Sequence, residues 1–193
     1  MDRRHALKKL GLGTGIVIAT PTLISFLQSC SNETVSWKPS FLTEEQGHVL
    51  KSIVDVILPK TDTPSASELN VPQFIDRFID EVTELEEQNN IQEAFSKLIN
   101  TIKSNYNENI NKVSVEQYKM LLDKHMILKE LSREKGNPIT VSNLLNTIKW
   151  MSINAYRTTE LIGETVLAYD PIPSEQKGCI SIKEATKGKA WSL

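Results

Sequence analysis

Residues 43–59, which read TEEQGHVLKSIVDVILP, decide the fold class. Thr43 stands three residues before Gln46, a pair that caps a helix because each side chain accepts a backbone N–H that the first helical turn leaves free. Apolar residues then recur every three or four positions, and Pro59 ends the run. The stretch therefore predicts an amphipathic helix, whose apolar face is made of Val49, Leu50, Ile53, Val54, Ile57 and Leu58.

Four later segments repeat this helical spacing. The second helix opens near Pro72, whose missing N–H costs nothing in a first turn, and the fourth opens with the capping pair Ser114 and Gln117. The fifth runs from about Ser142 to near Gly163. The apolar stripes of helices two to five are, in order, Phe74, Ile75, Phe78, Ile79, Val82 and Leu85; Ile91, Phe95, Leu98, Ile99 and Ile102; Tyr118, Leu121, Leu122, Met126 and Leu128; and Leu144, Leu145, Ile148, Met151 and Ala155.

The pattern predicts an all-α protein. No alternation of apolar and polar residues persists long enough to indicate a strand. The 193 residues suffice for one domain with a core of its own. We expect a single-domain helix bundle of about five helices over residues 42–193, with an irregular C-terminal tail.

The charge of the chain argues against nucleic-acid binding. The formal net charge is −2, and the first thirty residues hold four of the 22 basic residues but one of the 24 acidic residues. The remainder is therefore mildly acidic, and no basic patch alternates with aromatic residues.

Residues 1–30, MDRRHALKKLGLGTGIVIATPTLISFLQSC, have the order of an export signal: a basic start and then an apolar run. Arg3 and Arg4, followed by Leu7 and Lys8, resemble a twin-arginine signal, which exports a folded protein. The alternative is an ordinary general-secretion signal. Residues 31–41 are polar and contain proline, which indicates a tether.

The end of this segment resembles a bacterial lipobox. Leu27 stands three residues before Cys30, and Ser29 stands one before it. Cleavage before Cys30 and lipidation of its thiol would hold the protein on the periplasmic side of a bacterial membrane, because acyl chains bury their methylenes in the bilayer. The alternative is that Cys30 is a spare thiol near a cleavage site.

The chain offers no clear cluster of catalytic, cofactor-binding or metal-ligating residues. His5, His48 and His125 lie far apart in sequence, with no Cys or carboxylate at metal spacing. Neither a haem-attachment motif nor a dinucleotide fingerprint is present. The acidic pairs at Glu44 and in residues 84–87 are interpreted as solvated helix faces, and Cys179 is interpreted as a small buried residue of the tail.

A set of motifs nevertheless spans nearly the whole chain. In order they are WKPSFLTEEQ at residues 37–46, DVILPKTDTPSA at 55–66, VPQFID at 71–76, YDPIP at 169–173, GC at 178–179 and GKAWS at 188–192. Together they resemble the small subunit (subunit 3, or gamma) family of gluconate 2-dehydrogenase, whose members begin with a signal similar to Arg3–Lys8. Residues 155–160, AYRTTE, keep the Tyr, Thr and Glu of the family pattern but differ elsewhere, and Ser174 stands where the family often has Gly.

The resemblance implies a non-catalytic accessory role. In such complexes a large flavoprotein of the glucose-methanol-choline type holds FAD and oxidises a sugar acid or related alcohol, and in some a cytochrome c subunit with haem c passes electrons onward. The small subunit binds the flavoprotein, supports its maturation and accompanies it through export. The substrate then belongs to the partner and is not encoded in this chain.

The loop at residues 58–71 joins two helices through prolines and turn-forming residues. Thr61, Asp62 and Thr63 can form side-chain-to-backbone turns, which order a loop, and an ordered loop loses little entropy on binding. We expect this loop and the tail to form the flavoprotein-binding face; its candidate contacts are Thr61, Asp62, Pro64, Tyr169, Pro171, Pro173 and Trp191. The alternative is that both segments only wrap and close the bundle.

Two other functions compete with an accessory subunit. One is a free-standing periplasmic lipoprotein with a binding or structural role and no redox partner. The other is an enzyme in its own right, which would need a catalytic cluster that the sequence does not display.

Overall fold

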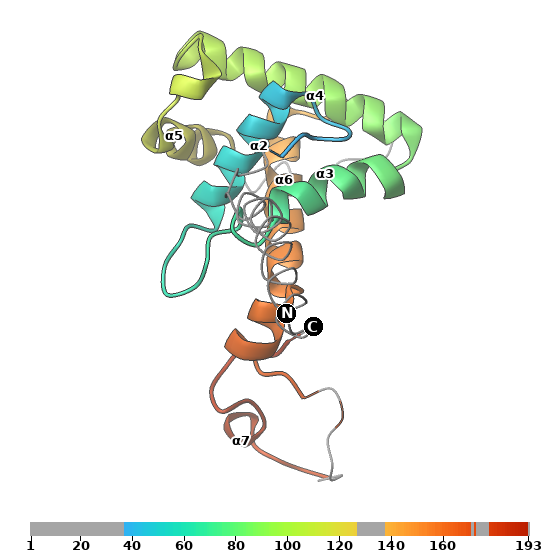
Figure 1. The fold of residues 1–193 in the computed structure, drawn as a ribbon, viewed down its shortest axis with the longest axis vertical. Coiled ribbons are helices and arrows are strands. Elements are labelled where there is room, and N and C mark those ends of the chain that lie inside the picture. Colours follow the sequence, from blue (N-terminus) through green and yellow to red (C-terminus); the bar gives the residue numbers. More distant parts are fainter. Residues whose placement is uncertain (1–36, 127–137, 171, 173–177, 193) are drawn as a thin grey trace, which may run out of the picture. The chain divides into compact units, whose positions relative to one another are not determined.

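The computed structural model describes residues 37–126, 138–170, 172 and 178–192, and it confirms the all-α fold class. Its elements are α2 (Glu44–Ile57), α3 (Val71–Val82), α4 (Leu85–Asn105), the 3₁₀ turn η1 (Ile110–Lys112), α5 (Val115–His125), α6 (Val141–Arg157), the π-helical turn η3 (Leu161–Val166) and α7 (Ile182–Thr186) (Figure 1). The chain divides into two units, Met1–Trp37 and Lys38–Leu193, and all of these elements belong to the second.

The structure contains the hydrogen bonds that were predicted at the starts of the helices. Thr43 Oγ1 accepts the N–H of Gln46 at 3.2 Å, and Gln46 Oε1 accepts the N–H of Thr43 at 3.0 Å. Ser114 and Gln117 make the same reciprocal pair at the start of α5. Pro72 lies in the first turn of α3, where it removes no helical hydrogen bond. The start of each of these helices is therefore determined by residues close in sequence and does not depend on packing.

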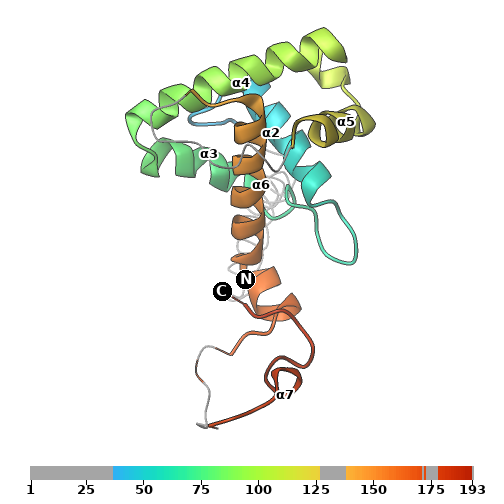
Figure 2. The same ribbon diagram turned by 180° about the vertical axis from the view of Figure 1, so that it is seen from behind.

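The core forms where α6 meets its neighbours. α6 contacts α2, α3, α4 and α5, and Figures 1 and 2 show its first turns lying among α2, α3 and α4. Each apolar side chain buried in full contributes about 1.5–3 kcal/mol through removal from water. The largest fully buried side chains are Tyr118, Phe95, Leu50, Ile53, Ile75, Leu98, Ile102, Leu121, Leu145, Ile148, Val49 and Val54.

Some predicted boundaries are wrong. Leu85, which was predicted to belong to the second helix, is the first residue of α4, and the fifth helix ends at Arg157 rather than near Gly163. The early end of α6 has a local cause, because the hydroxyls of Thr158 and Thr159 donate to carbonyls of the last turn, including Asn154 O and Tyr156 O. The chain then continues as η3. Leu128 lies outside the described residues.

The prediction for α3 is wrong in one respect: only two of the six residues of its predicted apolar stripe are buried. Ile75 and Ile79 lie in the core, whereas Phe74, Phe78 and Val82 are exposed, as is Leu85 at the start of α4. Neighbouring positions on a helix point about 100° apart. One apolar row of α3 therefore packs inward while the adjacent row, shifted by one residue, faces solvent.

Asp76 fixes the point where the chain enters the bundle. Its buried carboxylate accepts hydrogen bonds from Ser40 N at 2.7 Å, Ser40 Oγ at 3.0 Å, Phe41 N at 3.2 Å and Leu42 N at 2.9 Å. A buried carboxylate is tolerated only when such donors replace water. Asp76 therefore ties residues 40–42 to the middle of α3.

Within the described ranges, none of the helices has the length and apolar character needed to cross a membrane.

Candidate functional site

The loop between α2 and α3 is ordered along its whole length. Ala66 is fully buried; its N–H donates to Leu58 O at 3.1 Å, and its carbonyl accepts the N–H of Val71 at 3.0 Å. Nearer the tip, Thr61 N donates to Thr63 O at 2.9 Å and Thr63 N donates to Thr61 Oγ1 at 3.4 Å. The predicted side-chain-to-backbone turn therefore exists at Thr61, and Asp62 lies exposed beside it.

Two carboxylates hold the second half of this loop. Asp55 of α2 accepts Ser67 N at 2.9 Å and Ser67 Oγ at 2.6 Å. Glu68 accepts Lys60 Nζ at 2.6 Å and Ser65 N at 2.8 Å. The hydrogen bond from Lys60, together with that from Ser65, lowers the pKa of Glu68 below the usual value of a glutamate because both favour the charged carboxylate.

Tyr156, near the end of α6, fastens the loop tip to the bundle. Its hydroxyl lies 2.7 Å from Pro64 O and 2.9 Å from Thr63 Oγ1. A phenol has one proton, and Pro64 O can only accept, so Tyr156 donates to Pro64 O and accepts from the Thr63 hydroxyl. Tyr156 belongs to the part of the 155–160 motif that matches the family pattern. Its contacts with Thr63 and Pro64, which lie 93 and 92 residues earlier in the chain, were not predicted.

The last described residues of the tail, 190–192, lie against its first residue, Ala168, and against the end of α6. We call this contact the base of the tail. Ala168 and Trp191 form an isolated parallel bridge, in which Ala168 N donates to Ala190 O at 2.8 Å and Ser192 N donates to Ala168 O at 2.9 Å. Arg157 donates a guanidinium N–H to Trp191 O at 3.1 Å. The returning strand passes so close to η3 that a Cβ on Gly163 would lie 3.4 Å from Ser192 Oγ and 3.3 Å from Arg157 O.

Consecutive residues of α6 therefore bind the two predicted segments. Tyr156 holds the loop tip and Arg157 holds the base of the tail, so both segments are attached at the C-terminal end of α6. Thr61, Tyr169 and Trp191 are exposed there, and Pro64 is half-buried. Pro171 and Pro173 lie outside the described residues, as do Arg3, Arg4 and Cys30 of the predicted export and lipidation signals.

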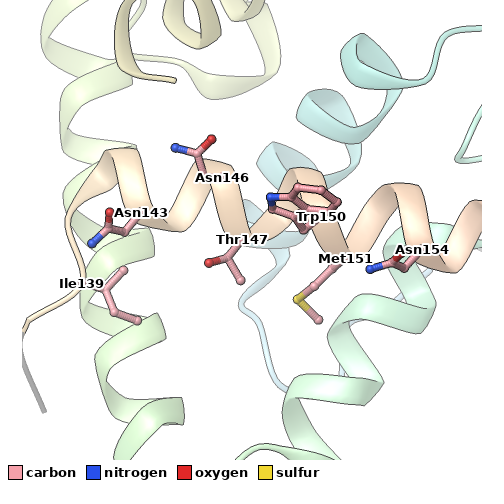
Figure 3. A pocket seen from close by; sticks show the side chains of 7 residues that line it. All are labelled: Ile139, Asn143, Asn146, Thr147, Trp150, Met151 and Asn154. Atoms are coloured by element: carbon pink, nitrogen blue, oxygen red, sulfur yellow. The ribbon is translucent and has the colours of Figure 1, made fainter. Parts of the chain in front are cut away.

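A second feature is a shallow groove along α6 with a volume of about 520 Å³ (Figure 3). It surrounds the exposed indole of Trp150, and no lining side chain is charged. Sequence reasoning placed only Met151 of this set, as a core residue, because periodicity identifies the buried face of a helix and not a groove on another face. The lining residues are Ile139, Asn143, Asn146, Thr147, Trp150, Met151 and Asn154.

The remaining reactive side chains are dispersed. His48 is exposed, and His125 is half-buried in the last turn of α5. The prediction that Cys179 is buried is wrong: it is free and exposed, as are its neighbours Gly178 and Ile180. Where the structure describes the chain, no three His, Cys, Asp or Glu side chains gather in a way that could hold a metal ion.

Comparison with known families gives one clear result. A family model described as gluconate 2-dehydrogenase subunit 3 matches residues 44–174, which include α2 to η3, the loop and the first residues of the tail. No curated protein and no solved structure matches the chain.

Proposed function

We propose that this chain, which belongs to the gluconate 2-dehydrogenase subunit 3 family, is the non-catalytic small subunit of a membrane-associated, flavin-dependent sugar or sugar-acid dehydrogenase. In this role it binds the FAD-containing large subunit, supports its maturation and is exported with it. The observation that carries the proposal is the family match over residues 44–174, which is most of the folded bundle.

The geometry at the end of α6 supports a binding role for the loop and the tail. The loop is fixed by Asp55, Glu68 and Tyr156, so its exposed tip loses little conformational entropy when a partner docks. Tyr169 and Trp191 flank the base of the tail and are each about half exposed. Large aromatic side chains of this kind supply much of the binding energy in protein interfaces.

The proposal extends to the N-terminal segment. Arg3 and Arg4 would direct the folded chain, with its partner, through the twin-arginine route, and a lipid on Cys30 would retain the complex on the periplasmic side of the membrane. FAD belongs to the large subunit, and a cytochrome c subunit with haem c would complete the complex in some forms. Which sugar or alcohol is oxidised depends on the large subunit.

The first experiment is a pull-down of the tagged chain from the native membrane fraction, followed by an absorbance spectrum and peptide sequencing of the eluate. We expect a large co-purifying protein with the absorbance bands of a bound flavin. A colourless, solitary chain, from a preparation in which other membrane complexes stay intact, would contradict the proposal and favour the free-standing lipoprotein.

The contribution of the tail can be tested with a pair of tryptophans. Trp191 is 50% exposed at the proposed face and Trp150 is 58% exposed in the groove along α6. Trp191→Ala should weaken binding of the flavoprotein at least about tenfold, as expected when an aromatic anchor is lost, whereas Trp150→Ala should leave it unchanged. Full binding by a folded Trp191→Ala variant would remove the tail from the interface.

A further inference from the structure

The exposed row of α3 is an apolar surface that the bundle does not use. Phe74 is 53% exposed, Phe78 40%, Val82 64% and Leu85 73%, and the two phenylalanine rings lie 6.1 Å apart. The first three recur every four residues, so they form one stripe along the helix, and Leu85 continues it across the turn into α4. We call these four residues the α3 stripe.

The α3 stripe is large for a surface with no partner. Side chains of this size present about 150–250 Å² each when fully exposed, so the observed fractions leave on the order of 400 Å² of apolar area in water. An exposed apolar patch of this size equals the largest one on a typical monomer, about 300–600 Å², and such patches are often functional. Ile75 and Ile79 are the buried side chains of this part of α3, so packing within the bundle does not account for the exposed parts of the two phenylalanine rings.

The surroundings of the α3 stripe are acidic. Residues 71–87 contain six acidic residues and one basic residue, Arg77, which pairs with Glu81 at 3.6 Å. Asp76 is buried, and Asp80 lies two positions from Phe78, about 200° around the helix and so on its other side. Glu81, three residues after Phe78, and Glu86, next to Leu85, are exposed and adjoin the stripe. The complementary surface therefore has an apolar centre and a rim of Lys and Arg.

We propose that the α3 stripe is a second docking surface for the large flavoprotein subunit, which meets it with an apolar patch rimmed by basic side chains. This inference rests on the proposed function, because it assigns a further contact to the same partner. It is separate from the loop and the tail, which are bound to α6 through Tyr156 and Arg157.

The charge of the rim disfavours two other occupants. A symmetric pair of copies would bring the acidic rims of both chains together, because a two-fold interface uses the same patch on each subunit. A membrane surface with anionic lipids carries a negative potential, which repels the rim and attracts basic segments instead. A basic-rimmed protein satisfies both the apolar stripe and its charges.

The test compares two double variants with equal numbers of exposed apolar residues removed. Phe74→Ser with Phe78→Ser changes the α3 stripe, and Val115→Ser with Met120→Ser changes exposed residues of α5 as a matched control. Each tagged full-length chain is bound to the purified large subunit, which is identified by its flavin absorbance, and the dissociation constant is measured. We expect at least about tenfold weaker binding for the α3 pair, as for the loss of interface anchors, and no change for the control.

A charge variant tests the rim independently. Glu81→Lys with Glu86→Lys keeps every residue of the α3 stripe and should slow association several-fold at low salt, with a difference that shrinks as salt rises, because screening removes long-range steering. Thermal unfolding of each variant checks the fold, and a single Phe74→Ser substitution, expected to weaken binding in the same direction, replaces the pair if the pair unfolds.

The outcomes separate this inference from the proposed function. If the wild-type chain binds the flavoprotein and the α3 variants bind equally well, the α3 stripe is not a docking surface while the accessory role stands. If the wild-type chain retrieves no flavoprotein, both fail. A wild-type dimer that the α3 pair dissociates in sedimentation, or binding to anionic vesicles that the α3 pair abolishes, would assign the stripe to self-association or to the membrane and overturn the proposal.

Discussion

The loop at residues 58–71 and the described part of the tail, which contains the short helix α7, are attached to the bundle in different ways. The loop is bonded at several points along its length, through Asp55 to Ser67, through Glu68 to Ser65 and through Tyr156 to Pro64. In the described part of the tail, the contacts with α6 and η3 are concentrated at its two ends, where Trp191 returns to Ala168.

Because of this difference, we expect the supports of the loop to contribute to the stability of the bundle and the base of the tail to contribute to binding. Substitutions in the supports of the loop should destabilise the bundle, because the loop buries Ala66 and continues directly into α3. Substitutions at the base of the tail should leave the bundle stable and change how the tail is presented to a partner. Substitutions at Asp55, Tyr156, Arg157 and Lys60 test this difference between the loop and the tail.

The largest effect is expected for Asp55→Ala. The substitution removes the acceptor of two hydrogen bonds from Ser67 and leaves a part-buried backbone N–H without its partner. Bonds to a charged acceptor contribute about 1.5–3 kcal/mol, so the free energy of unfolding should fall by about 2 kcal/mol. Chemical denaturation measures this change. Asp55→Asn, which keeps one side-chain acceptor, should lose less, and equal losses in the two variants would show that the bond to Ser67 N contributes little.

Tyr156→Phe should have a smaller effect on the same loop. It removes one hydroxyl that bridges Pro64 O and Thr63 Oγ1 while the ring stays in place. Loss of such neutral hydrogen bonds lowers the free energy of unfolding by about 1–2 kcal/mol. Amide hydrogen exchange should quicken in the loop around Thr63 and not at Ser192. An equal increase of the exchange rate in the loop and in the tail would contradict this difference, because it would mean that the two segments open together.

Arg157→Ala is the matching change on the tail and should barely affect stability. Its bond to Trp191 O is exposed, so the free energy of unfolding should change by no more than about 0.5 kcal/mol. The base of the tail should open more often, so trypsin should cleave faster after Lys187 and Lys189, whose side chains are already exposed but whose backbone must open to enter the protease. A loss of stability as large as that of Tyr156→Phe would show that the tail is part of the cooperative unit.

The features that could be predicted are those with a local cause. The Thr43 and Ser114 capping boxes and the first-turn Pro72 are written into residues three or fewer positions apart, and the structure confirms each of them. The 3.6-residue spacing of Val49, Leu50 and Ile53 likewise identified a core face correctly.

Features that depend on distant residues were not predictable in the same way. Whether the row at Phe74 or the row at Ile75 faces inward depends on where α6 lies, and nothing in residues 71–82 distinguishes the two rows by hydrophobicity. The partner of Tyr156 is a loop far earlier in the chain. The composition of residues 74–87, in which apolar residues alternate with acids, is the sequence signal for the docking surface that we propose.

The smallest effect concerns the pH dependence of the loop. The pKa of Glu68 is lowered in the folded state, first by the hydrogen bond from Lys60 and then by that from Ser65 N. Above the unfolded-state pKa the carboxylate is charged in both states and its stabilisation of the loop is complete; it is lost as the pH falls through the lower, folded-state pKa. The amide signal of Ser65 should therefore titrate below the usual range of a glutamate.

Lys60→Ala should raise the pH midpoint of the Ser65 titration. The amide signal of Ser192 in the tail should follow this titration in neither the wild-type chain nor the variant. Because Lys60 and Glu68 are both largely in solvent, added salt should move the midpoint of the wild-type chain toward that of the variant. If neither Lys60→Ala nor added salt changes the titration midpoint of Ser65, the hydrogen bond from Ser65 N alone lowers the pKa of Glu68. The loop would then be held in place by Asp55 and Tyr156 and not by the ion pair.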